Sequence, residues 1–160
     1  MIALACDHGA LDLKEAIKAH LEARGLEYKD FGTYTKDSCD YPDFGAKAAR
    51  AVAAGECDRG IVCCTTGIGI SIAANKIKGV RCALLHDHMS ARLTRQHNDA
   101  NMMALGAAVT PPTLASLLPL IIWPPAKMGC TAVTPAMVPF FIIEMLMGLP
   151  KAARASAGSD

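Results

Sequence analysis

Two adjacent cysteines followed by a threonine–glycine loop are the residues of this chain best suited to chemistry. Cys63 and Cys64 end an apolar run that begins at Gly60, and the loop 65–69 leads into helix-compatible residues up to Lys76. This order predicts a buried strand, a tight turn and a helix N-terminus, where backbone N–H groups and the helix dipole favour negative charge. A cysteine beside that positive pole is favoured as a thiolate. A base next to an anion-stabilising loop suits proton abstraction beside a carbonyl, because the enediolate oxygen must be stabilised.

The elements that must position these residues follow from the hydrophobic pattern. Leu13, Ile17 and Leu21 recur at four-residue spacing and predict a helix over 11–24 that Gly25 ends. A polar loop is expected through Tyr41-Pro42-Asp43. The expected strands are 2–6, 27–31, 60–64, 81–85 and 102–105, and the further expected helices are 44–54, 71–77 and 88–97.

Regular alternation of strands and helices predicts an α/β fold with a five-stranded parallel sheet covered by helices on both faces. Ligands of such sheets bind at the carboxyl ends of the strands. Asp7-His8, Cys64-Thr65-Thr66 and His86-Asp87 fall at such ends. Taken singly, the candidate functional residues of the chain have structural alternatives: Cys64 as an inert buried thiol, Asp7-His8 as a surface turn, His97-Asn98 as a helix end and Tyr41 as a loop anchor.

Composition excludes several classes of protein. The 160 residues suit one domain, and 16 Lys and Arg stand against 15 Asp and Glu without a basic run, which argues against a nucleic-acid partner. The seven cysteines lack zinc-type pairing and fit a reducing cytoplasm, so no metal is expected. The N-terminus has no signal-peptide pattern, and prolines cut each apolar run short of the ~20 residues that a membrane span needs.

Four segments together carry a family resemblance: 6–9 (CDHG), 40–43 (DYPD), 64–76 (CTTGIGISIAANK) and 90–101 (SARLTRQHNDAN). They closely resemble the ribose-5-phosphate isomerase B family, which includes galactose-6-phosphate isomerase subunits, and the resemblance extends from Met1 to about Val109. It implies a Rossmann-like three-layer sandwich and a metal-free, cofactor-free aldose–ketose isomerase acting on a sugar phosphate. It also implies a homodimer or homotetramer with active sites shared between subunits.

The resemblance also assigns roles residue by residue. The family's catalytic base falls on Cys64, and its ring-opening acid/base falls on His97. Strand alternation places Cys63 on the opposite face, as a core residue. The substrate-binding positions are Asp7, His8, Tyr41, Asn98 and the anion-hole loop of Thr65, Thr66, Gly67, Ile68 and Gly69. Thr65 stands where the family usually has glycine.

The family pattern breaks near Pro111. Residues 1–110 form the expected isomerase domain and hold one proline and 26 of the 31 formal charges, whereas 111–160 hold eight prolines. The family's phosphate-binding arginines are missing: one position is Ala108, and 111–150 contain no arginine. A frameshifted end would explain this break, and the family's C-terminal helix is not expected there.

Ribose 5-phosphate is the expected substrate. Allose or galactose 6-phosphate remains an alternative, as does an inactive assembly subunit or truncated product.

Overall fold

The structure, a computed structural model, describes residues 1–110. The expectations for the segment 111–160 lie outside the described residues. In order along the chain, the elements are β1 (Ile2–Cys6), a 3-10 turn (His8–Ala10), α1 (Leu11–Ala23), β2 (Tyr28–Asp30), α2 (Tyr41–Ala53), β3 (Arg59–Cys64), α3 (Ile68–Asn75), β4 (Cys82–Leu84), α4 (His88–Asn98) and β5 (Met102–Gly106).

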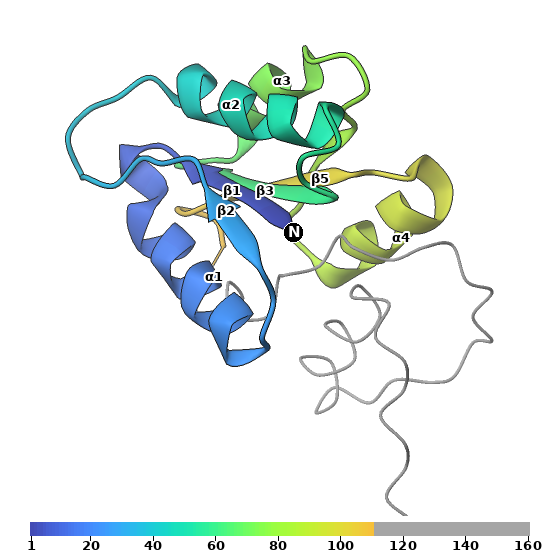
Figure 1. Ribbon diagram of the computed structural model, residues 1–160, viewed down its shortest axis with the longest axis horizontal. Coiled ribbons are helices and arrows are strands. Elements are labelled where there is room, and N and C mark those ends of the chain that lie inside the picture. Colours follow the sequence, from blue (N-terminus) through green and yellow to red (C-terminus); the bar gives the residue numbers. More distant parts are fainter. Residues whose placement is uncertain (111–160) are drawn as a thin grey trace, which may run out of the picture.

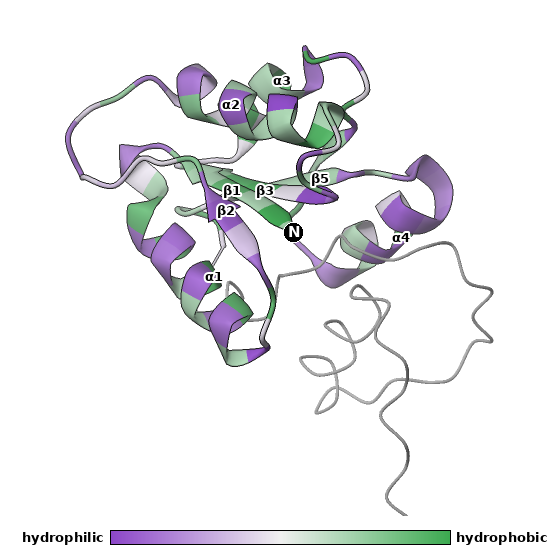
Figure 2. Ribbon diagram, in the orientation of Figure 1, coloured by the Kyte–Doolittle hydropathy of each residue, from purple (hydrophilic) through white to green (hydrophobic). Residues whose placement is uncertain are grey.

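The five strands form one parallel sheet in the order β2-β1-β3-β5-β4. Helices α2 and α3 cover one face, and α1 and α4 cover the other (Figure 1). The predicted α/β fold with a five-stranded parallel sheet is therefore confirmed. The central strands are strongly apolar, whereas the helices alternate polar and apolar residues (Figure 2), as expected of a sheet buried on both faces.

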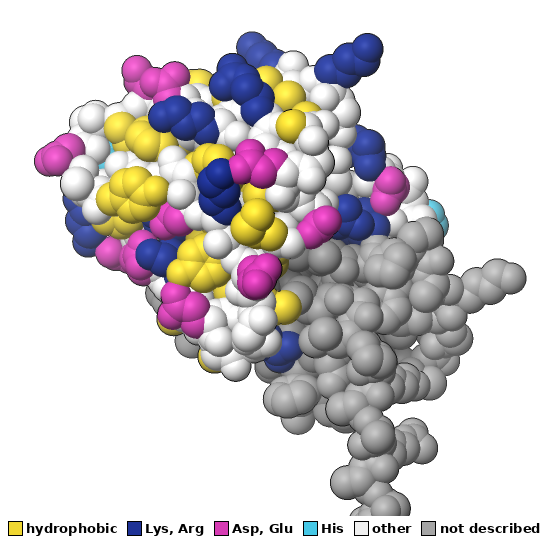
Figure 3. Space-filling model, in the orientation of Figure 1, with side chains coloured by type: hydrophobic (Ala, Val, Ile, Leu, Met, Phe, Trp, Pro, Cys, Tyr) yellow, Lys and Arg dark blue, Asp and Glu magenta, His cyan; other side chains and the backbone are white. Residues whose placement is uncertain are grey.

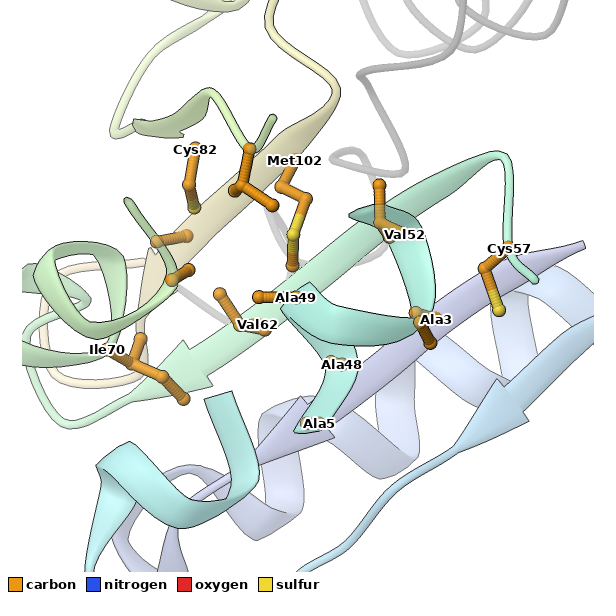
Figure 4. Packing of buried hydrophobic residues seen from close by; sticks show 14 of the residues in the cluster. Ala3, Ala5, Ala48, Ala49, Val52, Cys57, Val62, Ile70, Cys82 and Met102 are labelled. Atoms are coloured by element: carbon orange, nitrogen blue, oxygen red, sulfur yellow. The ribbon is translucent and has the colours of Figure 1, made fainter. Parts of the chain in front are cut away.

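Strand alternation divides the core into two clusters, one on each side of the sheet. On the α1 and α4 side, Leu13, Ile17 and Leu21 of α1 pack with Leu4 and other strand residues, so the predicted apolar stripe of this helix is buried. On the α2 and α3 side, small side chains dominate, and Figure 4 shows Ala48 and Ala49 of α2 close to the strands. Small residues on both surfaces allow the helix to approach the sheet closely.

Two helices begin earlier than the sequence pattern predicts. The loop expected through Tyr41-Pro42-Asp43 is wrong, because Tyr41 is the first residue of α2 and Pro42 lies in its first turn. Proline suits this place, since its fixed φ is helical and the first-turn N–H groups have no partner within the helix. Helix α3 begins at Ile68 rather than Ser71, directly after Gly67.

Within residues 1–110, none of the helices combines the length and apolar character needed to cross a bilayer. On the face in Figure 3, positive and negative side chains are interspersed over the described residues.

Candidate functional site

The candidate site lies where the direction of strand addition reverses. From β1 the chain adds β2 on one side and then returns to place β3 on the other, so the carboxyl ends of β1 and β3 flank a topological switch point. The Asp7 N–H donates to the Cys63 carbonyl at 3.1 Å, which joins the two strand ends directly. Open α/β sheets bind ligands at such a crevice.

Cys64 ends β3 and lies at the N-terminus of α3. Its side chain is 4 % exposed and belongs to the cluster on the α2 and α3 side. The Gly67 N–H donates to the Cys64 Sγ at 3.1 Å. Gly67 has a φ of 78°, and a Cβ at this position would lie 2.6 Å from the Leu84 Cδ1, so the turn that aims this N–H requires glycine. The sulfur is therefore held as a hydrogen-bond acceptor beside a helix N-terminus, where negative charge is favoured.

Cys63 has the opposite environment. It lies in the core cluster on the α1 and α4 side, and complete burial raises the pKa of its thiol well above the usual range. The two adjacent cysteines thus face different layers, as strand alternation predicts. Of the pair, Cys64 is the one placed for chemistry.

The backbone N–H groups of the loop after Cys64 lie at the carboxyl edge of the sheet, as Cys64 does. The fold of this loop is fixed locally: the Ile68 N–H donates to the Thr66 Oγ1 at 3.3 Å, and the Ser71 Oγ donates to the Ile68 carbonyl at 2.7 Å. The first-turn N–H groups of a helix, here Gly69 and Ile70, have no carbonyl within the helix to bind. Together they form an arrangement that suits an oxyanion.

Asp7 follows β1 and contributes a buried carboxylate. It is 5 % exposed, and its Oδ1 has no hydrogen-bond partner among the described residues. Burial raises the pKa of this carboxyl. A buried polar atom without a protein partner is suited to accept a hydrogen bond from a ligand hydroxyl.

His8 and Tyr41 border the same edge. The half-buried His8 ring accepts at Nδ1 from the Cys39 N–H at 3.2 Å. The Tyr41 ring lies against Gly69, where an added Cβ would be 2.6 Å from the Tyr41 Cζ. Glycine at this position therefore lets the aromatic ring rest on the first turn of α3.

A cavity of about 370 Å³ opens next to the loop, on the α1 side. Its walls include Thr65 and Ala108, and the Ala108 N–H donates to the Thr65 carbonyl at 2.9 Å. The other lining residues are Gly9, Asp12, Leu13, Ala16, Ala107 and Thr110. These lining residues include no cation and one anion, Asp12, so this wall offers a phosphate hydroxyl and backbone groups beside a carboxylate.

His97 and Asn98 lie elsewhere. They end α4, and just before β5 begins at Met102 the Asn101 carbonyl accepts from the Gly60 N–H at 3.1 Å. Gly60 and Cys64 are four residues apart in β3, which is roughly 13 Å along a strand. The end of α4 is thus at the amino edge of the sheet and Cys64 at the carboxyl edge. One copy of the chain does not bring His97 and Cys64 together.

Within residues 1–110, no group of three or more His, Cys, Asp and Glu side chains is placed to hold a metal ion. The polar groups gathered at the carboxyl edge are a thiol, a carboxylate, an imidazole and backbone donors. These groups can move protons and bind oxygen atoms.

Two residues that shape the surroundings of the site could not be identified from the sequence. One is Cys39, whose contact with His8 spans 31 positions of the chain. The other is Lys14, which is fully buried and bridges both oxygens of Asp30 and the Thr33 carbonyl. No local sequence pattern predicts the contact between Cys39 and His8. Burial of Lys14 is not expected either, because lysine side chains are normally solvated.

Comparisons with known proteins agree on one family. A sequence profile described as ribose/galactose isomerase matches residues 2–119. Ribose-5-phosphate isomerase B of Escherichia coli is 48 % identical over 117 residues, which are 73 % of this chain and 78 % of that protein. Galactose-6-phosphate isomerase subunit LacB of Clostridium acetobutylicum is 43 % identical over 110 residues, which are 69 % of this chain and 64 % of that protein.

Solved structures give the same picture. Ribose-5-phosphate isomerase B of Clostridium thermocellum is 54 % identical with a TM-score of 0.70, covering 71 % of this chain and 77 % of that one. The Mycoplasma genitalium enzyme with bound ribulose 5-phosphate is 38 % identical with a TM-score of 0.67, covering 70 % of this chain and 75 % of that one.

Proposed function

The chain belongs to the ribose/galactose isomerase family of sugar-phosphate aldose–ketose isomerases, and we propose that it interconverts ribose 5-phosphate and ribulose 5-phosphate. The observation that carries the proposal is the Cys64 Sγ, held by the Gly67 N–H at the N-terminus of α3. Asp7 and His8 directly follow the neighbouring strand β1 and lie at the same edge of the sheet. Binding of ribulose 5-phosphate by the Mycoplasma genitalium relative supports the choice of a pentose phosphate.

In the proposed reaction, the Cys64 thiolate takes the proton from C2 of the open-chain aldose. The C–H electron pair forms the C1–C2 double bond, and the carbonyl pair moves to O1, where the loop N–H groups stabilise the negative charge. The Cys64 thiol returns its proton to C1, and the O2 hydroxyl proton is transferred to O1, which leaves a ketone at C2. Each proton and electron pair remains within the substrate and the thiol.

The other substrate-binding groups have separate roles. The unpartnered Asp7 Oδ1 accepts from a sugar hydroxyl, and the Tyr41 ring, which lies against Gly69, borders the substrate. Thr65 and Thr66 provide hydroxyls at the loop, and the His8 imidazole donates to the phosphate end. Because Ala108 and the other residues of the nearby cavity carry no positive charge, we expect weak phosphate affinity.

Opening of the furanose ring is assigned to His97, with Asn98 beside it, from a second copy of the chain. The opposite positions of His97 and Cys64 in one copy support this shared site. Helices α3 and α4 also expose apolar side chains at four-residue spacing, Ile68 with Ile72 and Met89 with Leu93. Such stripes suit a contact between identical subunits.

The deciding experiment is ketose formation from ribose 5-phosphate by the purified chain, with allose 6-phosphate and galactose 6-phosphate in parallel assays. The highest kcat/KM is expected with ribose 5-phosphate. A preference for galactose 6-phosphate would identify the activity of the LacB relative instead. Absence of ketose from all three sugars would favour an inactive assembly subunit.

A further inference from the structure

The His8 imidazole has one nitrogen already engaged by the protein backbone. Its Nδ1 lies 3.2 Å from the Cys39 backbone N, and the Cys39 Sγ lies 3.7 Å from the same ring nitrogen. A backbone N–H can only donate, so Nδ1 must present its lone pair. A neutral imidazole with an acceptor at Nδ1 carries its proton on Nε2.

The Cys39 N–H is held in place at both ends of its segment. At the start, the Thr33 N–H donates to the Cys6 carbonyl at 2.8 Å, and the buried Lys14 Nζ donates to the Thr33 carbonyl at 2.6 Å. At the end, the Asp43 N–H donates to the Asp40 carbonyl at 3.2 Å as α2 begins. The donor that meets His8 therefore belongs to an anchored segment.

We propose that the Cys39 backbone N–H is a positioning group that fixes His8 as the neutral Nε2–H tautomer. In this role His8 is a single hydrogen-bond donor to the phosphate end of the substrate and contributes no positive charge. The Cys39 thiol is not needed, because the backbone N–H alone determines which ring nitrogen accepts. The substrate part of this inference rests on the proposed function, whereas the tautomer itself does not.

The direct test is nitrogen-15 NMR of the imidazole rings in the full chain at neutral pH, with His8 assigned by its loss in His8→Gln. The expected spectrum has an unprotonated Nδ1 and a protonated Nε2. A ring protonated at Nδ1, or at both nitrogens, would overturn the proposal. This measurement needs no substrate, so the tautomer can be verified even if ribose 5-phosphate is not isomerised.

Two pairs of variants test the consequence for binding. Cys39→Pro removes the N–H, and we expect KM to rise about fivefold, the scale of one hydrogen bond, with a smaller change in kcat. Cys39→Ala retains the N–H and is the matched control. Equal effects of both variants on KM would contradict a role for the backbone group.

The second pair separates donor from charge and does not depend on whether Cys39→Pro folds. The Gln amide of His8→Gln places a donor near the position of Nε2, whereas the shorter side chain of His8→Asn does not. We expect His8→Gln to retain a KM several-fold lower than that of His8→Asn. If both variants lose binding equally, His8 acts through its positive charge and the proposal fails.

Discussion

Cys63 and Cys64 are neighbours in sequence with opposite surroundings. Alternation along β3 directs one thiol into the core on the α1 and α4 side and the other to the N-terminus of α3. Of the two thiols, only the Cys64 Sγ receives a loop N–H within residues 1–110, and the donor is Gly67. The same side-chain type therefore serves packing at one position and can serve acid–base chemistry at the next.

Replacing each cysteine by alanine should separate these roles. We expect Cys64→Ala to lose isomerisation by several orders of magnitude with little change in folding, because the proposed base is removed. Cys63→Ala should mainly lower the free energy of unfolding, by about 1 kcal/mol, through the small cavity that it leaves. Steady-state kinetics and urea unfolding of both variants measure the two effects. The reverse pattern would assign the base to Cys63.

Asp7 is a residue whose burial should lower stability. Burial raises the pKa of its carboxyl, so the ionised form is less favourable in the folded chain than in the unfolded one, and stability is lost as the pH rises through the folded-state pKa. We expect Asp7→Asn to raise the free energy of unfolding by about 1 kcal/mol at neutral pH while lowering kcat/KM. The gain should disappear in acid, where Asp7 is protonated. A destabilised Asp7→Asn protein at neutral pH would contradict this account.

At the scale of elements, α1 anchors the segment that leads to Cys39. Lys14 of this helix is fully buried, and its Nζ lies 3.0 and 2.8 Å from the two oxygens of Asp30. The Nζ also lies 4.6 Å from the centre of the Tyr34 ring. A lysine at this depth connects α1, the end of β2 and the following segment.

Loss of this contact should be costly. Lys14→Met leaves Asp30 without its buried partner, and we expect a loss of about 3 kcal/mol in the free energy of unfolding. The matched control is Lys18→Met on the same helix, whose amino group lies 3.6 Å from Asp30 and is partly exposed. Its loss should stay below about 1 kcal/mol. If the two variants lost similar free energies of unfolding in chemical denaturation, burial of Lys14 would not contribute to stability beyond an exposed ion pair.

The elements also show what could be predicted from sequence. The five strands and four helices follow from short apolar runs and from the spacing of Leu13, Ile17 and Leu21, because these patterns are local. The start of α2 at Tyr41 does not follow from the sequence pattern, since Pro42 favours a loop as well as a helix N-terminus. The contacts of Cys39 with His8 and of Lys14 with Asp30 join distant segments, so they depend on the tertiary fold.

At the scale of the whole molecule, Asp7, His8 and Cys64 lie at the carboxyl edge of the sheet. His97, at the end of α4, lies at the amino edge. This separation follows from topology: a helix that connects parallel strands runs back toward the edge where the next strand begins. The family roles expected for Cys64 and His97 therefore need two copies of the chain for one site.

Mixing two inactive variants tests this arrangement. Cys64→Ala and His97→Ala should each isomerise ribose 5-phosphate poorly, and His97→Ala should retain more activity on erythrose 4-phosphate, which has no furanose ring to open. After unfolding and refolding together, we expect about one quarter of wild-type activity, because half of the dimers are mixed and each mixed dimer holds one complete site of two.

Separately refolded samples, combined only in the assay, are the control and should stay inactive. Sedimentation at the assay concentration reports whether dimers are present. Dimers that form in the mixture without restoring activity would place His97 and Cys64 in separate functions and leave Cys64 to act with groups of its own subunit.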